Sequence, residues 1–235
     1  MHEWYAAPME GLTGWRWRQV QHEMFGGAAL YVTPFVSPNG NFSFQRKELE
    51  ELDPERNRGI PVVPQILTNR AEYFVWAAKE CRSRGWAQVD LNLGCPSGTV
   101  TGKKKGAGLL RQPELLRQLL DGIFDALPDM KISVKTRIGW ERAEEWPALL
   151  ALLETYPICR LTVHPRVRTQ FYKGTADREV FRWTAEHTAL PLCYNGDVTT
   201  GCDLREMGEA FPDDAVMVGR GLVADPSLLR QATGG

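Results

Sequence analysis

Eight short apolar runs recur along the chain, and longer segments of mixed character separate them. Most of the runs are continuously apolar rather than alternating, which is typical of strands buried on both faces of a parallel sheet. The alternation of such runs with longer segments constrains the fold more than any other feature of the sequence. It predicts parallel strands over residues 4–9, 28–36, 61–67, 87–94, 131–139, 160–165, 190–196 and 215–221.

The segments between the runs have the spacing of amphipathic helices, most clearly at 69–85, 112–128 and 143–157. About eight strand–helix units with no linker or low-complexity segment favour an α/β fold, the (β/α)8 TIM barrel, as a single domain over residues 1–235. A doubly wound open sheet is the alternative. That fold should carry a glycine-rich fingerprint after its first strand, and "APMEGLTG" (7–14) does not match one.

Composition limits the partners of this chain. Its 43% hydrophobic and 24% charged residues are ordinary for a globular protein with a packed core. The formal net charge is -1, so no global charge attracts a polyanion. A nucleic-acid partner would need a local basic patch.

The cysteines indicate the compartment. They are odd in number, widely spaced and contain no C-x-x-C pair, which argues against a disulfide framework or a metal site and fits a reducing cytosol. The N-terminal residues do not read as a secretory signal, and no apolar run approaches the roughly 20 residues of a membrane span. We expect a cytoplasmic protein with no metal and no membrane contact. The five cysteines are Cys81, Cys95, Cys159, Cys193 and Cys202.

Polar and conformationally special residues gather where the expected strands end. In a TIM barrel these strand ends and the loops after them meet at one mouth, where chemistry takes place. The sequence therefore predicts one site at that mouth. Its members are Pro8, Met9, Gln65, Asn92, Cys95, Lys135, Arg137, His164, Arg166, Asn195, Asp197, Gly219 and Arg220.

Seven motifs in order resemble those of the tRNA-dihydrouridine synthases, from about residue 5 to residue 230. They are "APMEG", "LNLGCP", "KGAGLL", "VKTRIGW", "VHPR", "NGDV" and "MVGRG". The most specific part is G-C-P followed by K-x-G-A-x-L-L, and the bacterial C-type branch is the most similar. The resemblance implies a flavoprotein TIM barrel that reduces the C5=C6 bond of a uridine in the tRNA D-loop. It implies FMN as cofactor and NADPH or NADH as reductant.

Residues at the last two strand ends fit the FMN phosphate, since barrel phosphate sites often form there. Glycines allow close approach of backbone N–H groups, and an arginine supplies charge; tight turns are the alternative explanation for the glycines. The residues concerned are Asn195, Gly196, Asp197, Gly219 and Arg220.

Other residues fit the flavin ring. By resemblance, Lys135 lies against the ring and offsets the negative charge of reduced flavin, although a lysine that merely reaches solvent from a strand end is the alternative. Gln65 would bind the polar edge of the ring. Pro8 and Met9 would pack on it, and ordinary core packing is nearly as good an explanation for those two.

Cys95 has three possible roles. Its thiol could fill space in the core, act as a thiolate (a metal ligand or a nucleophile), or donate a proton as a general acid. By resemblance, reduced flavin passes a hydride to C6 of uracil and Cys95 protonates C5. A thiol with a reference pKa near ~8.5 is mostly protonated at neutral pH and can donate. A nucleophile or metal ligand would need a thiolate with partners that the spacing does not show. A purely structural, buried role fits Cys81, Cys159 and Cys193 better than Cys95. We therefore predict that Cys95 is a general acid.

Four further residues are candidates for the substrate. Asn92 and Arg137 fit the uracil carbonyls, because an amide offers both donor and acceptor and a guanidinium offers a fixed fork. His164 and Arg166 fit flavin phosphate, flavin ring or substrate, and a structural histidine is a fair rival. The uridine would have to leave its stack to reach the pocket.

A basic rim is expected beside the same mouth. Lys103, Lys104 and Lys105 follow Cys95 closely and, with Arg137, Arg142, Arg166 and Arg168, would contact tRNA phosphates. A solvated loop is the alternative. Aromatic residues in "TQFYKG" (169–174) add a weak signal for base stacking.

The sequence departs from the family pattern in one place. Typical members carry a helical domain after the barrel, whereas this chain ends at "LLRQATGG", so we expect no such domain and a monomer. How tRNA would be held without that domain stays open. Two rival functions stay open. One is a related flavin barrel acting on a free pyrimidine or another small alkene, and the other is a non-catalytic RNA-binding or flavin-binding short form.

Overall fold

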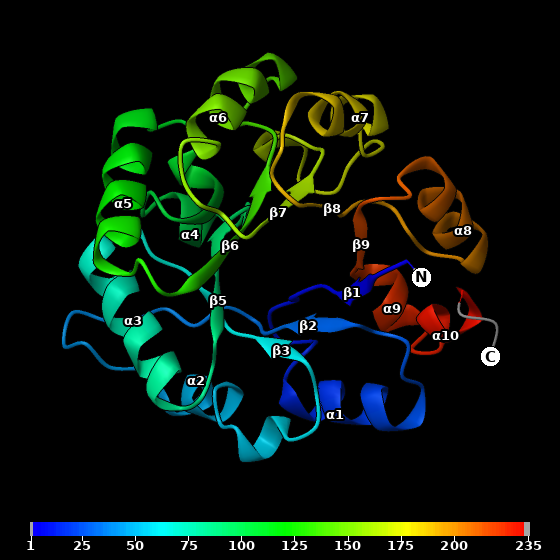
Figure 1. The fold of residues 1–235 in the computed structure, drawn as a ribbon, viewed down its shortest axis with the longest axis horizontal. Coiled ribbons are helices and arrows are strands. Elements are labelled where there is room, and N and C mark those ends of the chain that lie inside the picture. The colour runs from blue at the N-terminus through cyan, green and yellow to red at the C-terminus, as the bar shows by residue number, and fades with distance from the viewer. Residues whose placement is uncertain (1, 233–235) are drawn as a thin grey trace.

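The computed structural model describes residues 2–232 as one barrel of parallel strands inside a ring of helices (Figure 1). Every strand pair is parallel, which the continuous apolar runs predict. The strands are β1 (Trp4–Ala6), β2 (Leu30–Val32), β3 (Val62–Val63), β4 (Gln65–Ile66), β5 (Gln88–Leu93), β6 (Lys131–Arg137), β7 (Arg160–His164), β8 (Leu192–Tyr194) and β9 (Ala215–Val218).

The sheet closes at Pro64. The strand order is β3-β2-β1-β9-β8-β7-β6-β5-β4, so its two ends, β3 and β4, are halves of one run. Pro64 has no N–H to give to a ladder and interrupts that run. β4 still contacts the segment after β2, through a parallel bridge between Val36 and Ile66. The predicted α/β TIM barrel is therefore confirmed.

Helices cover the outside of the barrel. They are α1 (Trp15–Met24), α2 (Arg46–Glu51), α3 (Ala71–Ser83), α4 (Gly98–Thr101), α5 (Pro113–Ala126), α6 (Trp146–Leu153), α7 (Arg178–His187), α8 (Gly201–Ala210), α9 (Arg220–Ala224) and α10 (Leu228–Ala232). Four 3-10 turns lie among them, η1 (Glu55–Asn57), η2 (Gly106–Leu109), η3 (Ala143–Glu145) and η4 (Arg168–Gln170).

Alternation along β5 and β6 separates the core from the barrel interior. Leu91, Leu93 and Val134 are fully buried in the main hydrophobic cluster between sheet and helices. Because neighbouring strand residues point to opposite faces, Asn92 and its register partner Lys135 point inward. The barrel interior is thus polar towards the carboxyl ends of these strands.

All eight predicted strand ranges were too long; for example, 190–196 is strand only over Leu192–Tyr194, and 215–221 only over Ala215–Val218. The run 4–9 is strand only over Trp4–Ala6, and 28–36 only over Leu30–Val32. Prolines at positions 8 and 34 have no N–H for a ladder, and both leave the sheet to line the cavity described below. Within residues 2–232, no helix is long and apolar enough to cross a bilayer.

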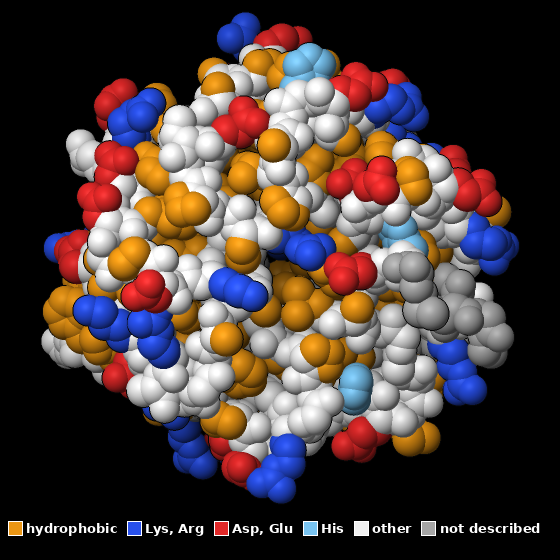
Figure 2. Space-filling model, in the orientation of Figure 1, with side chains coloured by type: hydrophobic (Ala, Val, Ile, Leu, Met, Phe, Trp, Pro, Cys, Tyr) orange, Lys and Arg blue, Asp and Glu red, His pale blue; other side chains and the backbone are white. Residues whose placement is uncertain are grey.

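Charges of both signs are interspersed around the periphery of the molecule in the view of Figure 2. This agrees with the near-neutral net charge. No single basic field dominates that view, so charge alone does not mark a polyanion-binding face there.

Candidate active site

One cavity of about 290 Å³ lies where the strands end. This is close to the lower end of the range of about 300–1,000 Å³ for small-molecule and cofactor sites. Residues from eight strand ends and the loops after them meet there. The predicted site residues that line it are Pro8, Met9, Gln65, Asn92, Cys95, Lys135, Arg137, His164, Arg166, Asn195, Gly196, Asp197, Gly219 and Arg220.

The three lysines after Cys95 do not line this cavity. Lys103 and Lys104 are exposed, whereas Lys105 is half-buried and its ammonium donates to Ser37 Oγ at 3.1 Å. Burial lowers the pKa of Lys105, and the charge of Lys103 lowers it further. The backbone of the loop is held to the barrel, since Cys95 O accepts the N–H of Ala107 at 3.1 Å. The lysine loop therefore lies outside the cavity but is tied to the segment that carries Cys95.

A chain of side-chain hydrogen bonds leads from the barrel interior to Cys95. Gln65 Nε2 donates to Asp90 Oδ2 at 2.8 Å, and Gln65 Oε1 accepts from Asn92 Nδ2 at 2.7 Å. Asn92 Oδ1 then accepts the backbone N–H of Cys95 at 2.9 Å and of Gly94 at 3.1 Å. Each amide can bond in this way in only one flip state, because Asp90 as a carboxylate only accepts. Asp90 thus fixes the orientation of both amides and of the backbone at Cys95.

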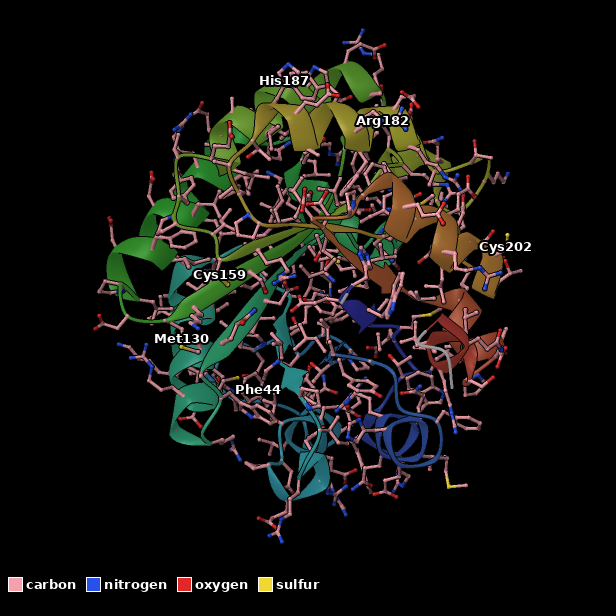
Figure 3. All side chains as sticks on the ribbon, turned by 45° about the vertical axis from the view of Figure 1, so that its right-hand side comes forward. Phe44, Met130, Cys159, Arg182, His187 and Cys202 are labelled. Atoms are coloured by element: carbon pink, nitrogen blue, oxygen red, sulfur yellow. The ribbon has the colours of Figure 1, made fainter. Side chains whose placement is uncertain are left out.

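Cys95 is the one cysteine of the chain that lies in this cavity. Burial raises the pKa of its thiol, although the charges of Arg137 and Lys135 act in the opposite direction. The thiol is therefore protonated at neutral pH. Figure 3 shows Cys202 on α8 at the edge of the molecule, and Cys159 precedes β7 at the opposite end of the strand.

Asp90 and Lys135 are two ionisable groups on adjacent strands, of which Asp90 is buried and Lys135 partly buried. Burial raises the pKa of Asp90 to about 6, opposed by hydrogen bonds from Gln65 and Ser133. Burial lowers the pKa of Lys135 to about 8, and the neighbouring charge of Arg137 lowers it further. Among the described residues no acceptor lies within hydrogen-bond distance of the Lys135 ammonium, which faces the cavity. An anionic group in the cavity would satisfy it.

Arg137 donates most of its hydrogen bonds to backbone carbonyls. Its guanidinium donates to Gly94 O at 3.0 Å, Val167 O at 3.1 Å and Phe171 O at 2.7 Å. These contacts join the loop that carries Cys95 to the loop after β7. Arg137 lines the cavity, but most of its donors hold the mouth together.

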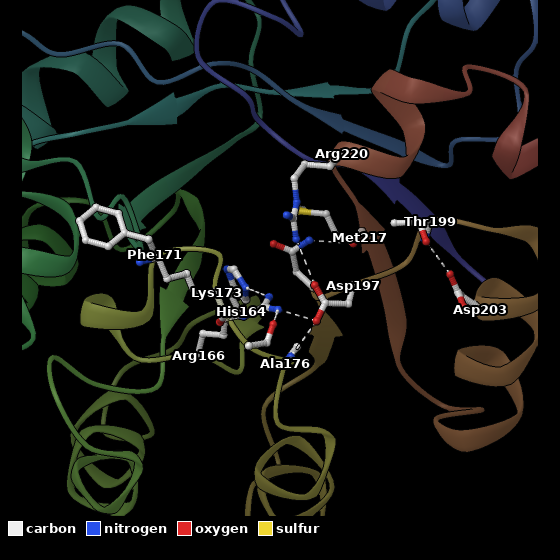
Figure 4. A network of polar contacts seen from close by, with 12 residues as sticks. His164, Arg166, Phe171, Lys173, Ala176, Asp197, Thr199, Asp203, Met217 and Arg220 are labelled. Atoms are coloured by element: carbon white, nitrogen blue, oxygen red, sulfur yellow. Dashed lines mark hydrogen bonds and ion pairs between the residues drawn. The ribbon is translucent and has the colours of Figure 1, made fainter.

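A second, ionic network occupies the other side of the mouth (Figure 4). Asp197 accepts from Arg166 at 2.5 Å, from Arg220 at 3.0 Å and from the backbone N–H of Ala176 at 2.7 Å. Arg166 is buried and also donates to Gly174 O at 2.6 Å. Burial alone would raise the pKa of Asp197, but these hydrogen bonds and charges hold it below its ordinary value.

His164 is neutral and its tautomer is fixed. Arg166 Nη1 lies 3.1 Å from His164 Nε2, and because an arginine only donates, this nitrogen accepts and the proton lies on Nδ1. Burial lowers the pKa of His164 well below its ordinary value, and the charges of Arg137 and Lys135 add to this. His164 therefore lines the cavity as a neutral imidazole.

The two glycines predicted for a phosphate differ. A Cβ on Gly196 would lie 2.6 Å from Ala176 Cβ, so packing within the protein requires glycine there. A Cβ on Gly219 would make only ordinary contacts of 3.4 Å with Ala7 and Met9, at the cavity wall. Packing does not require glycine at 219, and open backbone at this wall suits close approach of a ligand.

Two residues of the site did not stand out in the sequence. Asp90 has a recoverable signal, since it is a charge inside an apolar run, two residues before Asn92 and so on the same face of β5. Tyr172 lines the cavity and is 52% exposed, from a loop that we noted only as aromatic. Within residues 2–232 no cluster of three or more His, Cys, Asp or Glu side chains is arranged to hold a metal ion.

Solved structures share this fold at low sequence identity. Histamine dehydrogenase from Rhizobium sp. 4-9 superposes with a TM-score of 0.72 and 14% identity, over 99% of this chain and 46% of that chain. Morphinone reductase superposes with a TM-score of 0.64 and 12% identity, over 99% of this chain and 86% of that chain. The fold and the cavity define a TIM barrel with one polar site at its carboxyl-terminal strand ends.

Sequence relatives identify the family. A probable tRNA-dihydrouridine synthase of Rickettsia conorii is 30% identical over 96% of this chain and 67% of its own length. One of Rhizobium leguminosarum bv. phaseoli is 33% identical over 94% and 68%. The tRNA-dihydrouridine synthase B of Proteus vulgaris is 31% identical over 96% and 69%. This relative is of the B type, so the comparison does not support the C-type branch that we predicted from the motifs.

The sequence profile of the dihydrouridine synthase (Dus) family matches residues 5–234. The chain therefore belongs to the dihydrouridine synthase family. The predicted class of enzyme, a flavin-dependent oxidoreductase, is confirmed with it.

Proposed function

We propose that this chain is an FMN-dependent tRNA-dihydrouridine synthase, which uses NADPH to reduce the C5=C6 bond of a uridine in the tRNA D-loop. Cys95 is the proton donor. The family and the names of the relatives support the reaction class and the tRNA substrate.

The observation that carries the proposal is a protonated thiol at the wall of a cavity that also contains an unpartnered ammonium. Asn92 fixes the backbone of Cys95, and burial keeps its proton at neutral pH. A thiol in that state donates a proton rather than attacking as a nucleophile. Lys135 faces the same cavity from the adjacent strand.

The residues present fit a flavin. Bound FMN would supply the hydride, and the protein would supply binding, orientation and electrostatics. Lys135, without a protein acceptor among the described residues, would stabilise negative charge on the ring. Gln65 retains one N–H for the polar edge of the ring, since its other polar contacts go to Asp90 and Asn92. Pro8 and Met9 present apolar surface at the same wall.

The phosphate would lie against Asn195, Gly196, Gly219 and Arg220. The open wall at Gly219 admits close approach of an oxyanion. Arg220 donates to Asp197 Oδ1 through one nitrogen and its side chain is about half exposed, so other N–H groups of its guanidinium are available.

The exposed Lys103 and Lys104 support a macromolecular anion as substrate over a free pyrimidine. Asn92 Oδ1 and Nδ2 are already bonded within the protein, so Asn92 orients Cys95 in addition to any contact with uracil. Arg137 keeps few donors for uracil for the same reason.

An anaerobic absorption experiment tests the function. Protein reconstituted with FMN should show a flavin spectrum that bleaches with NADPH and returns on addition of unmodified tRNA, but not with free uracil or orotate. Reoxidation by the free pyrimidine and not by tRNA would favour the small-molecule reductase. A protein that takes up no FMN would contradict the proposal.

A further inference from the structure

We propose that the exposed ring of Phe171 is a stacking platform for a nucleobase beside the reacting uridine. The inference rests on the proposed function for the identity of the RNA. It assigns a binding residue outside the cavity, in the loop after β7.

Phe171 combines a rigid backbone with an exposed ring. Its N–H bonds to Arg168 O at 3.1 Å, and its carbonyl accepts from Arg137 at 2.7 Å. The side chain is nevertheless 41% exposed. In Figure 4 it points away from the Arg166–Asp197 network. An anchored backbone with a free ring is what a ligand-stacking surface needs, because little conformational entropy is lost on binding.

The ring is part of a ladder of cations and aromatic rings. The Arg168 guanidinium lies 4.7 Å from the ring centre of Phe171 and 4.6 Å from that of Trp140. Arg111 lies 4.3 Å from the Trp140 ring. Arg168 also donates to Pro96 O at 3.1 Å, directly after Cys95. The platform is thereby joined to the loop that carries the proposed proton donor.

The backbone at Phe171 is strained, with φ 52° and ψ -101°. A positive φ is a genuine outlier for an aromatic residue and persists only where surrounding contacts impose it. Phe42 makes a useful comparison, with φ 51° and 44% exposure. The Phe42 ring, however, packs edge-on against Tyr73 and Trp76 at 5.3 and 6.2 Å. Among the described residues the Phe171 ring has no aromatic partner; the Arg168 guanidinium packs on it, and the ring still leaves 41% of the residue exposed for a ligand.

The chemistry of this platform favours a nucleobase. Proteins that hold single-stranded nucleic acid combine basic residues with aromatic rings on which bases stack, and cation–π contacts from arginine add to this. The adjacent Tyr172 lines the cavity. A base on Phe171 would therefore belong to a nucleotide close to the uridine that enters the cavity, once the loop of the RNA is unstacked.

The test measures the affinity of the oxidised, FMN-loaded enzyme for unmodified tRNA, without NADPH, at several salt concentrations. Phe171→Leu keeps size and removes the ring face, whereas Phe171→Trp keeps an aromatic face. We expect about a tenfold loss of affinity for Leu and a change below about twofold for Trp, from the usual worth of one stacked base. The slope of log affinity against log salt should not change, because no charge is removed.

A double substitution, Lys103→Gln with Lys104→Gln, provides the contrast. If these lysines contact phosphates, it should reduce the salt slope by about one per lysine and act on all RNA sequences alike. Thermal midpoints of Phe171→Leu and Phe171→Trp equal to that of wild type would show that the loop is intact in both.

Wild-type affinity in Phe171→Leu would overturn the proposal, as would equal losses in Leu and Trp or a wild-type enzyme that binds no tRNA at low salt. A raised KM for NADPH with unchanged tRNA affinity would assign the ring to the adenine of the reductant instead. Failure of tRNA to reoxidise reduced flavin would contradict the proposed function, but it would leave the binding comparison readable because binding is measured without turnover.

Discussion

The two sides of the barrel mouth differ in how their polar side chains are paired. On the side of β4, β5 and β6, neutral hydrogen bonds link Gln65, Asn92 and the backbone of Cys95, and the Lys135 ammonium has no protein acceptor among the described residues. On the side of β7, β8 and β9, Arg166 and Arg220 share the carboxylate of Asp197. Donors that are already bonded within the protein hold loops in place, whereas donors without a protein acceptor remain available for a ligand. We therefore propose that proton transfer takes place on the first side, and that the second side holds the loops in place and would bind the FMN phosphate.

The pKa values of Asp90 and Asp197, one aspartate from each network, are shifted in opposite directions. Burial raises the pKa of Asp90 to about 6, and the arginine contacts of Asp197 outweigh its burial and lower its pKa. Ionised Asp90 therefore costs folding free energy, and ionised Asp197 supplies it. Two substitutions separate these effects.

Asp90→Asn should give the larger stability effect. The folded pKa of Asp90 is above its unfolded value, so its contribution is fully present below about pH 4 and is lost as pH rises through about 6. The loss by pH 7 is on the order of 3 kcal/mol. Asparagine does not titrate, so urea unfolding from pH 4 to 7 should show the variant gaining by about that amount relative to wild type.

The exposed Asp129, in the turn before β6, provides a matched control. Asp129→Asn removes a carboxylate from the surface, so a change of the pH profile that it shares with Asp90→Asn would not come from burial. A profile for Asp90→Asn parallel to that of wild type would mean that burial does not raise the pKa of Asp90, and the distinction between Asp90 and Asp197 would fail.

Asp197→Ala should give the smaller effect, about 2 kcal/mol at pH 7, since it leaves the buried Arg166 with only neutral acceptors. The folded pKa of Asp197 is lowered, so its contribution is present above the unfolded value and is lost as pH falls through the folded one. The cost of the substitution should therefore shrink below about pH 4. Thermal unfolding at pH 3 and pH 7 measures this.

Asp197→Asn keeps an oxygen acceptor and should cost less than Asp197→Ala. An equal cost at both pH values for Asp197→Ala would show that the ionic network contributes nothing through charge, and the scaffold role of this side would be wrong.

Much of this arrangement was accessible from the sequence, because the parallel pattern places all strand ends at one mouth. Asn92, Lys135, His164 and Asn195 lie together for that reason. Their positions follow from strand order alone. The functional roles assigned to them stay predictions.

The hydrogen-bond partners of the site residues could not be predicted from the sequence. The bond between Gln65 and Asp90 joins residues 25 apart and depends on the register of β4 against β5. Arg137 and Arg166 read as substrate ligands, but the structure directs their donors largely to carbonyls of neighbouring loops and to Asp197. Loop geometry of this kind, like the positive φ of Phe171, is fixed by tertiary contacts rather than by local pattern.

Single-turnover kinetics would show whether Cys95 donates the proton. FMN-loaded enzyme, reduced anaerobically with NADPH, is mixed with unmodified tRNA, and flavin absorbance is followed for wild type, Cys95→Ala and the exposed-cysteine control Cys202→Ala. We predict that Cys95→Ala retains FMN and is reduced normally, but that tRNA reoxidises it at least about a hundredfold more slowly. Cys202→Ala should match wild type. Equal reoxidation rates in Cys95→Ala and wild type would contradict the account.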